Sequence, residues 1–112
     1  MTVAVERESL LMRGTLDMCV LSLLGRRPMH AYGVVQLLQE HGFAQTSYGT
    51  VYPLVSRLRR QGLLAQDLEP GESGPARNVL RLTDEGRVAL GNWTQQWREV
   101  NERVSDLLEG KT

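Results

Sequence analysis

The sequence has one cysteine, two histidines, one lysine and no long apolar run. The lone cysteine, Cys19, excludes a disulfide framework and a multi-cysteine zinc site within one chain. Its place in an apolar run favours a small buried side chain over a redox role. His30 and His41 are too few and too isolated to favour a metal site, although histidines of two subunits could meet at a dimer axis. We therefore expect no metal and no cofactor.

No stretch reaches the roughly 18 apolar residues that a membrane span needs. The first ten residues, MTVAVERESL, carry charges where a secretion signal requires an apolar core, which predicts a cytoplasmic protein. The chain also lacks a nucleophile beside a histidine base, a carboxylate pair in an apolar frame and a G-x-x-x-x-G-K-[ST] phosphate loop. We expect that it is not an enzyme.

The net charge is zero, with 13 basic and 13 acidic residues, but the two signs are unevenly distributed. The first 62 residues contain seven basic and four acidic residues, whereas the remaining 50 contain six basic and nine acidic ones. No acid occurs between Glu40 and Asp67. Three arginines cluster in that interval: Arg57, Arg59 and Arg60. Because arginine suits phosphate and guanine, nucleic acid is a candidate partner for one face of the chain.

Apolar residues recur at helical spacing in four segments of the 112-residue chain. The expected helices run from Arg13 to Leu24, from about His30 to His41, from about Ser47 to Gln61, and from Thr83 to about Leu108. The side chains expected to face inward in the first three are Leu16, Cys19, Val20, Leu23, Leu24, Val34, Val35, Leu37, Leu38, Tyr48, Val51, Leu54, Val55 and Leu58. Pro53 predicts a slight bend in the third helix or a start later than Ser47.

Between the third and fourth helices the period changes from helical to alternating. LLAQDLE and ARNVLRLT alternate roughly by two, and the turn-forming residues 70–75 separate them. Three helices followed by a hairpin is the order of a winged helix. We therefore predict a mainly α fold with a small β-hairpin, a winged helix-turn-helix over residues 1–83 and a long dimerisation helix over residues 84–112.

The last helix carries apolar residues at steps of three and four, which is typical of a helix that packs along another helix. The residues expected at a dimer interface are Leu90, Trp93, Trp97, Val100, Val104 and Leu107.

The third helix has a polar face and is the candidate for entering a DNA major groove. Hydroxyl groups near its start can approach bases or phosphates, whereas its C-terminal arginines favour phosphate. The residues predicted to bind DNA, hairpin included, are Ser47, Tyr48, Thr50, Tyr52, Arg57, Arg59, Arg60, Arg77 and Arg81. Ser47 also suits a helix cap. The Tyr52 hydroxyl could touch a phosphate, or its ring could pack between the third helix and the hairpin.

Three stretches together resemble the PadR family of bacterial transcriptional regulators: LMRGTLDMCVLSLLGRRPMHAYGVVQLL, SYGTVYPLVSRLRRQGLL and RLTDEGRVAL. The likeness covers roughly residues 10–108. It implies a homodimeric winged helix, usually a repressor that a small molecule releases from its operator. It also implies that Ser47, Thr50 and Tyr52 lie on or beside the DNA-reading helix, with the hairpin tip on the DNA backbone. The chain length matches the short-tailed members, which end in one long helix.

Some short-tailed relatives bind flat aromatic drugs in a pore across the dimer axis, stacked between one tryptophan from each subunit. The resemblance places Trp93 at that position. The residues that it implies for the pore are Asp17, Met18, Leu21, Ala89, Leu90, Trp93 and Trp97. Trp93 could equally serve interface packing alone, and Trp97 could enlarge the stacking surface or fill the pore.

The hairpin departs from the family pattern. Asn78 stands where many relatives have a basic residue, and Val79 and Leu80 replace paired aromatics, so the hairpin is less basic than usual. The main hypothesis is a homodimeric DNA-binding regulator, a repressor released by a small, planar aromatic ligand. The alternative is a winged-helix module for protein interaction, or a ligand carrier, without sequence-specific DNA binding.

Overall fold

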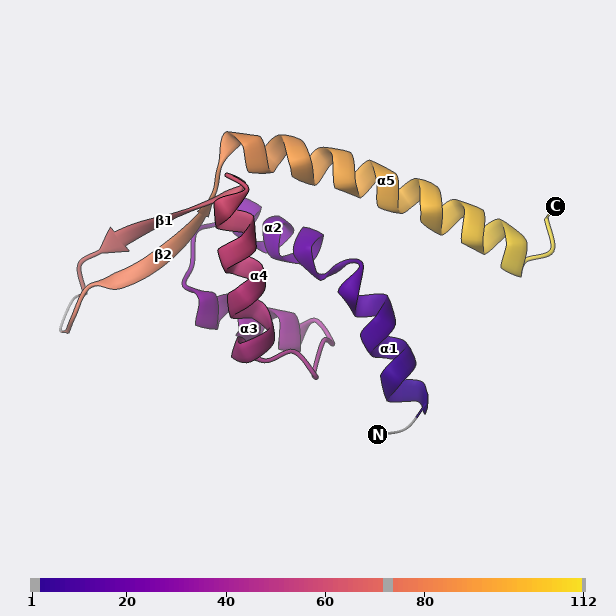
Figure 1. The fold of residues 1–112 in the computed structure, drawn as a ribbon, viewed down its shortest axis with the longest axis horizontal. Helices are drawn as coiled ribbons and strands as arrows, with labels where there is room; N and C mark the ends of the chain where they lie inside the picture. The colour runs from indigo at the N-terminus through magenta and orange to yellow at the C-terminus, as the bar shows by residue number, and fades with distance from the viewer. Residues whose placement is uncertain (1–2, 72–73, 112) are drawn as a thin grey trace.

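The computed structural model describes residues 3–71 and 74–111, which form five helices and one two-stranded antiparallel sheet. The elements are α1 (Val3–Arg13), α2 (Leu16–Arg26), α3 (Ala31–Glu40), α4 (Tyr48–Arg60), β1 (Leu64–Glu69), β2 (Arg77–Leu82) and α5 (Asp84–Leu108). The hairpin and α5 extend from opposite sides of the helical body, and the molecule measures 58 × 35 × 21 Å (Figure 1). The predicted fold class, mainly α with a small hairpin and a long C-terminal helix, is confirmed.

One apolar core lies between α2, α3 and α4, and the base of the hairpin closes it. Five of its side chains have no exposed surface: Val20, Leu21, Val34, Val51 and Leu58. Leu64, Leu80 and Leu82 of the hairpin complete the same cluster. Each such side chain contributes about 1.5–3 kcal/mol of burial free energy. The helical periodicity therefore predicted the buried faces of α2, α3 and α4 well, with Cys19 and Leu37 only half-buried.

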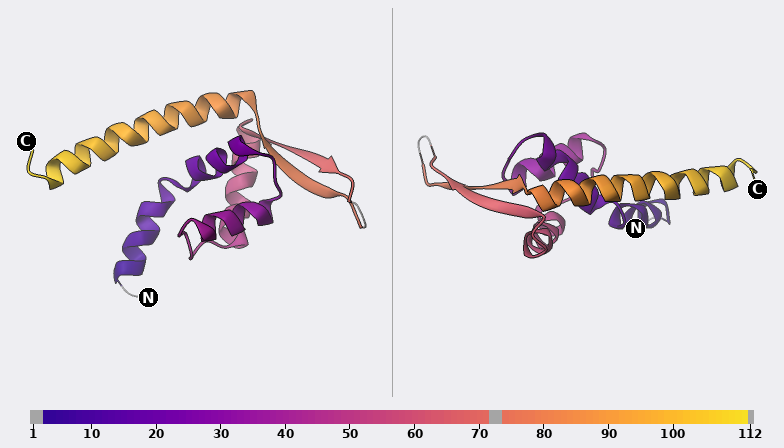
Figure 2. Two further views of the ribbon diagram at one scale, coloured as in Figure 1. Left: turned by 180° about the vertical axis from the view of Figure 1, so that it is seen from behind. Right: turned by 90° about the horizontal axis from the view of Figure 1, so that it is seen from above.

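The first predicted helix is wrong at its N-terminal end. The sequence favoured one helix starting at Arg13, whereas α1 ends there and α2 starts at Leu16 after a turn at Gly14 and Thr15. The segment of α1 is rich in good helix formers, and it carries Glu6 in its first turn and Arg13 in its last, which complement the helix dipole. Periodicity missed α1 because its exposed apolar pair, Leu10 and Leu11, is adjacent and forms no stripe. Figure 2 shows that α1 leads away from the body.

The start of α4 is fixed by a side-chain cap. The Ser47 Oγ accepts a hydrogen bond from the Thr50 amide at 3.3 Å, and the helix runs from Tyr48 through Pro53 to Arg60. The predicted start near Ser47 is confirmed. Tyr48 does not belong to the buried face, because it lies at the flank of that face and stacks on Tyr52 instead of entering the core.

The hairpin is joined to the helices by backbone pairing. β1 and β2 pair from Leu64 opposite Leu82 to Glu69 opposite Arg77. Met29, between α2 and α3, exchanges two backbone hydrogen bonds with Leu80, at 3.2 and 2.8 Å. The base of the hairpin is therefore held to the α2–α3 connection as well as to the core.

The end of α4, the hairpin and the start of α5 meet at one junction. The Thr83 hydroxyl donates to the Gly62 carbonyl at 2.7 Å, the Thr83 amide donates to the Leu63 carbonyl at 3.1 Å, and the Gly86 amide donates to the Thr83 hydroxyl oxygen at 3.0 Å. A Cβ at Gly86 would overlap the Leu63 carbonyl oxygen, so only glycine allows this close approach.

Only the first part of the α5 apolar face is covered within the chain. Leu90 and Trp93 pack against the core, and α5 then continues past α2 (Figures 1 and 2). The exposed fractions of the next four apolar residues are 45% for Trp97, 48% for Val100, 49% for Val104 and 68% for Leu107. We call these four residues the α5 stripe.

Replacing Gly86 by alanine should lower the free energy of unfolding by about 1–3 kcal/mol, the usual cost of overpacking. Urea denaturation monitored by circular dichroism measures this change. Gly91→Ala is the matched control in the same helix, because a Cβ there meets nothing within 4 Å. It should leave stability unchanged or raise it by up to about 1 kcal/mol. Equal stability of the two variants would show that the junction tolerates a side chain.

Candidate functional site

The N-terminal turn of α4 is open to solvent. Ser47, Tyr48, Gly49 and Thr50 are all exposed, and the Ser47 and Thr50 hydroxyl oxygens lie 3.2 Å apart. The first amides of a helix carry a partial positive charge and donate readily to an anion. This end of α4 therefore presents hydroxyls and helix amides together, as the sequence predicted.

Three exposed tyrosines lie across α3 and α4. The ring centroids of Tyr48 and Tyr52 are 5.5 Å apart with an angle of 28° between the ring planes, and those of Tyr32 and Tyr48 are 6.4 Å apart. Tyr52 is thus accessible beside the helix start. The sequence analysis did not name Tyr32, because its ring meets Tyr48 only through the packing of α3 against α4.

The three arginines near the end of α4 are exposed and form no ion pair within residues 3–71 and 74–111. Two of them, Arg59 and Arg60, line a polar hollow of about 400 Å³ together with Ser56, Leu64, Ala65 and Gln66. We call Arg57, Arg59, Arg60 and this hollow the arginine surface. It joins the C-terminal part of α4 to β1 and carries uncompensated positive charge.

One hairpin arginine is already paired. The Arg81 Nε donates to the Asp67 Oδ2 at 2.9 Å, and both side chains are about half-exposed. This hydrogen bond lowers the pKa of the Asp67 carboxyl. Arg81 and Asp67 together therefore present no net charge to the solvent, whereas the sequence analysis predicted Arg81 as a DNA-binding cation.

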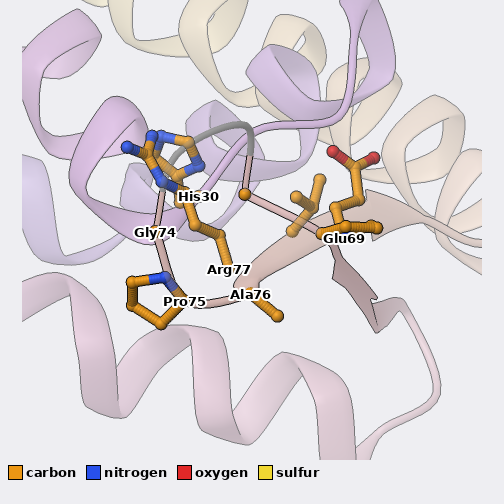
Figure 3. A pocket seen from close by; sticks show the side chains of 9 residues that line it. His30, Glu69, Gly74, Pro75, Ala76 and Arg77 are labelled. Atoms are coloured by element: carbon orange, nitrogen blue, oxygen red, sulfur yellow. The ribbon is translucent and has the colours of Figure 1, made fainter.

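The other hairpin arginine, Arg77, lines a hollow of about 560 Å³ between the hairpin and the start of α3. His30 lies on the same side of this hollow as Arg77, and the Glu69 carboxylate points to a different side (Figure 3). Glu69 is opposite Arg77 in the strand register, but no ion pair joins them in the described part of the chain. Among the described residues, Arg77 therefore has no ionic partner.

A second candidate site is an apolar groove of about 320 Å³ between α2, α5 and the residue Phe43. Its lining residues are Thr15, Met18, Cys19, Ser22, Phe43, Leu90, Thr94 and Trp97, and these eight define the apolar groove. Met18, Leu90 and Trp97 belong to the predicted ligand set. The sequence reasoning missed the other five, because Phe43 follows α3 in a loop and the remaining four are small or polar.

The remaining predicted ligand residues lie outside this groove. Leu21 has no exposed surface in the core, and Ala89 and Trp93 are half-buried against it. The Asp17 Oδ1 accepts a hydrogen bond from the Met18 amide at 2.7 Å. Within one chain, the tryptophan available to a ligand in the groove is therefore Trp97.

Cys19 lies between this groove and a smaller hollow of about 210 Å³ that Arg26, His41 and Phe43 also line. Burial raises the pKa of the Cys19 thiol, and the nearby Asp17 carboxylate adds to the effect. The thiol is therefore protonated at neutral pH and acts as a small apolar lining group, as expected from its sequence context.

Within residues 3–71 and 74–111, no three histidine, cysteine, aspartate or glutamate side chains are grouped so that they could hold a metal ion. None of the helices formed by these residues is both long and apolar enough to cross a membrane.

Comparison with known proteins assigns the family. Residues 20–92 match the model of the Transcriptional regulator PadR-like family. A transcriptional regulator of Mycobacterium tuberculosis is 36% identical over 84 residues, which are 75% of this chain and 74% of the relative.

Solved structures agree with this assignment. The crystal structure of a PadR family transcriptional regulator from Eggerthella lenta is 39% identical, with a TM-score of 0.85, and the match covers 96% of this chain and 93% of that one. A PadR-like regulator from Bacillus cereus is 31% identical with a TM-score of 0.81, and the match covers 88% of this chain and 95% of that one. The prediction that the chain is not an enzyme is confirmed, since these relatives are regulators of transcription. With its helix-turn-helix, hairpin and long last helix, the chain belongs to the PadR-like family of DNA-binding transcriptional regulators.

Proposed function

We propose that the chain is a homodimeric repressor that binds a pseudo-palindromic operator through α4 and is released by a small, planar aromatic ligand. The observation that carries the DNA-binding part is the surface of α4. Exposed hydroxyls and amides lie at its start, and near its end lie three arginines that form no ion pair with any other described residue. The start of α4 then reads bases in the major groove, and the arginine surface contacts phosphates. The hairpin places Arg77, and Arg81 when it is released, on the flanking backbone.

The uncovered α5 stripe supports the homodimer. Leaving four large apolar side chains in water is unfavourable in free energy. The same stripe of a second copy would bury them. In this proposal residues 1–83 form the DNA-binding unit and residues 84–112 form the dimerisation helix. A two-fold axis on α5 also sets the distance between the two copies of α4, and half-sites about one DNA turn apart match this arrangement. Binding to chromosomal DNA would place its action in the cytoplasm.

The ligand part of the proposal rests on the apolar groove. Its walls come from α2, which belongs to the helix-turn-helix, and from α5, which carries the dimer stripe. A flat aromatic molecule would stack on the accessible face of Trp97 beside Met18 and Leu90. In the dimer, Trp93 would lie one step before the α5 stripe and Trp97 at its first position, and a pore between the copies would extend this groove.

The DNA-binding part is tested by fluorescence anisotropy with a labelled duplex from the DNA upstream of the chain's own gene and a scrambled duplex. Tighter, salt-sensitive binding to the upstream duplex is expected. Arg59→Ala with Arg60→Ala should weaken binding to both duplexes and reduce the salt slope by roughly one unit per lost phosphate contact.

Arg98→Ala is the control for that experiment, because Arg98 is exposed on α5 away from the stripe. Its salt slope should equal that of the parent chain. Weak binding without preference for the upstream duplex would favour the alternative function, a protein-interaction module or ligand carrier.

The dimer is tested by placing a charge on the stripe. Val104→Glu should convert the dimer to a monomer at micromolar concentration, because each copy would bury an unpaired charge in an apolar contact. Light scattering coupled to gel filtration measures the mass. Arg98→Glu introduces the same side chain off the stripe and should remain dimeric. A dimeric Val104→Glu would place the interface elsewhere on the chain.

The ligand site is tested with anilinonaphthalene sulfonate, an aromatic dye that fluoresces in apolar surroundings. The dye should quench tryptophan fluorescence and lower the affinity for the upstream duplex. Trp97→Ala should weaken dye binding about tenfold and abolish most of the quenching, because the dye stacks on Trp97, whereas Trp93→Ala should leave DNA binding largely intact and remove only the part of the quenching that comes from Trp93. Trp93→Ala chains that elute as monomers would make Trp93 a structural residue and remove the pore.

A further inference from the structure

The ion pair between Arg81 and Asp67 lies beside the arginine surface. Asp67 is on β1 and Arg81 is on β2, in diagonal positions on one face of the hairpin, because Arg81 is directly opposite Ala65. Ala65 itself lines the hollow that Arg59 and Arg60 share. Arg81 is thus the cation that would extend the arginine surface from α4 onto the hairpin.

Asp67 has an unusual position in the charge pattern. It is the first acid after Glu40, at the end of an interval in which Arg57, Arg59 and Arg60 have no acidic neighbour in sequence. These three arginines form no ion pair in the described residues, whereas Arg81 does. Asp67 is therefore the acid that pairs with Arg81 at the border of the surface, and the Asp84 carboxylate adds a weaker attraction to the same guanidinium.

A DNA phosphate and the Asp67 carboxylate would compete for the same guanidinium. Both are oxyanions that arginine binds through charge-assisted hydrogen bonds. Both side chains of the pair are exposed, and exposed pairs are weak, so the carboxylate and a phosphate compete for Arg81 with comparable strength. The Asp67 carboxyl stays ionised at neutral pH, since its pKa is lowered, and the competition is present throughout the physiological range.

We propose that Asp67 limits DNA affinity by holding Arg81 away from phosphate, and that it thereby sets the affinity of the hairpin for the DNA backbone. The inference rests on the proposed DNA-binding role of α4 and the hairpin. Asp67 is a positioning residue in it, because it acts through Arg81 and does not touch DNA.

The test is a double-mutant cycle with the full chain and the labelled upstream and scrambled duplexes. Asp67→Asn keeps the shape of the side chain and removes its charge. It should tighten binding to both duplexes roughly twofold to fivefold at low salt. It should also steepen the salt slope by about 0.9, the value for one added phosphate contact on B-DNA. In an Arg81→Gln background, Asp67→Asn should leave the salt slope unchanged.

Glu69→Gln is the matched control. It removes one negative charge from the same strand and the same face, two residues further along, but Glu69 does not pair with Arg81. Its effect on affinity should be smaller, with no change in slope. Thermal unfolding of each variant checks that the hairpin is intact, which is expected because both acids are exposed.

Three results overturn the inference. Equal increases in DNA affinity for Asp67→Asn and Glu69→Gln would show that each change only reduces the repulsion between an acidic side chain and the DNA phosphates. A gain that persists in the Arg81→Gln background would show that Arg81 is not the contact. An unchanged affinity for Asp67→Asn, in a parent chain that binds DNA, would contradict this inference and leave the proposed function standing. A parent chain that binds neither duplex would contradict both.

Discussion

The close approach of Gly86 to the Leu63 carbonyl determines how the two candidate sites are placed relative to each other. At this contact the end of α4, the first residue of the hairpin and the first turn of α5 meet, and Thr83 links all three by hydrogen bonds. The candidate DNA surface lies on α4 and the hairpin, whereas the apolar groove and the α5 stripe depend on α5. A rigid junction fixes the direction of α5 with respect to α4. In a dimer built on α5, it therefore also fixes the separation of the two α4 helices.

Charge distribution, more than total charge, makes this chain suitable for DNA. A neutral protein gains little long-range attraction to a polyanion, so its contacts must come from local clusters. The arginine surface is such a cluster, because no acidic residue occurs in the sequence between Glu40 and Asp67. The negative excess lies mainly on α5, whose five acids outnumber its three basic residues, whereas the two strands of the hairpin carry two acids and two arginines. The chain as a whole therefore attracts DNA only weakly, and the attraction comes mainly from the arginine surface on one side of the molecule.

Periodicity was enough to predict the helical core, because Val51, Leu54, Val55 and Leu58 repeat on one face and are buried there. It failed for α1, whose apolar residues are adjacent and remain exposed. It could not find the Asp67–Arg81 pair, because the register of two strands joined by the seven residues 70–76 is not fixed by an alternating pattern alone. Phe43 and Tyr32 were missed for a similar reason. Each contributes to a site through tertiary packing of α3 and its following loop, which no single-segment pattern describes.

The position of the apolar groove explains how a ligand there could act on DNA binding. A ligand shifts an equilibrium only through different affinities for its two states. One wall of the groove is α2, packed in the same core as α4, and the other is α5, which carries the stripe. A planar molecule between them binds best at one spacing of α2 and α5. If the operator-bound dimer requires another spacing, occupation of the groove and binding of DNA oppose each other by the same free energy, whichever ligand binds first.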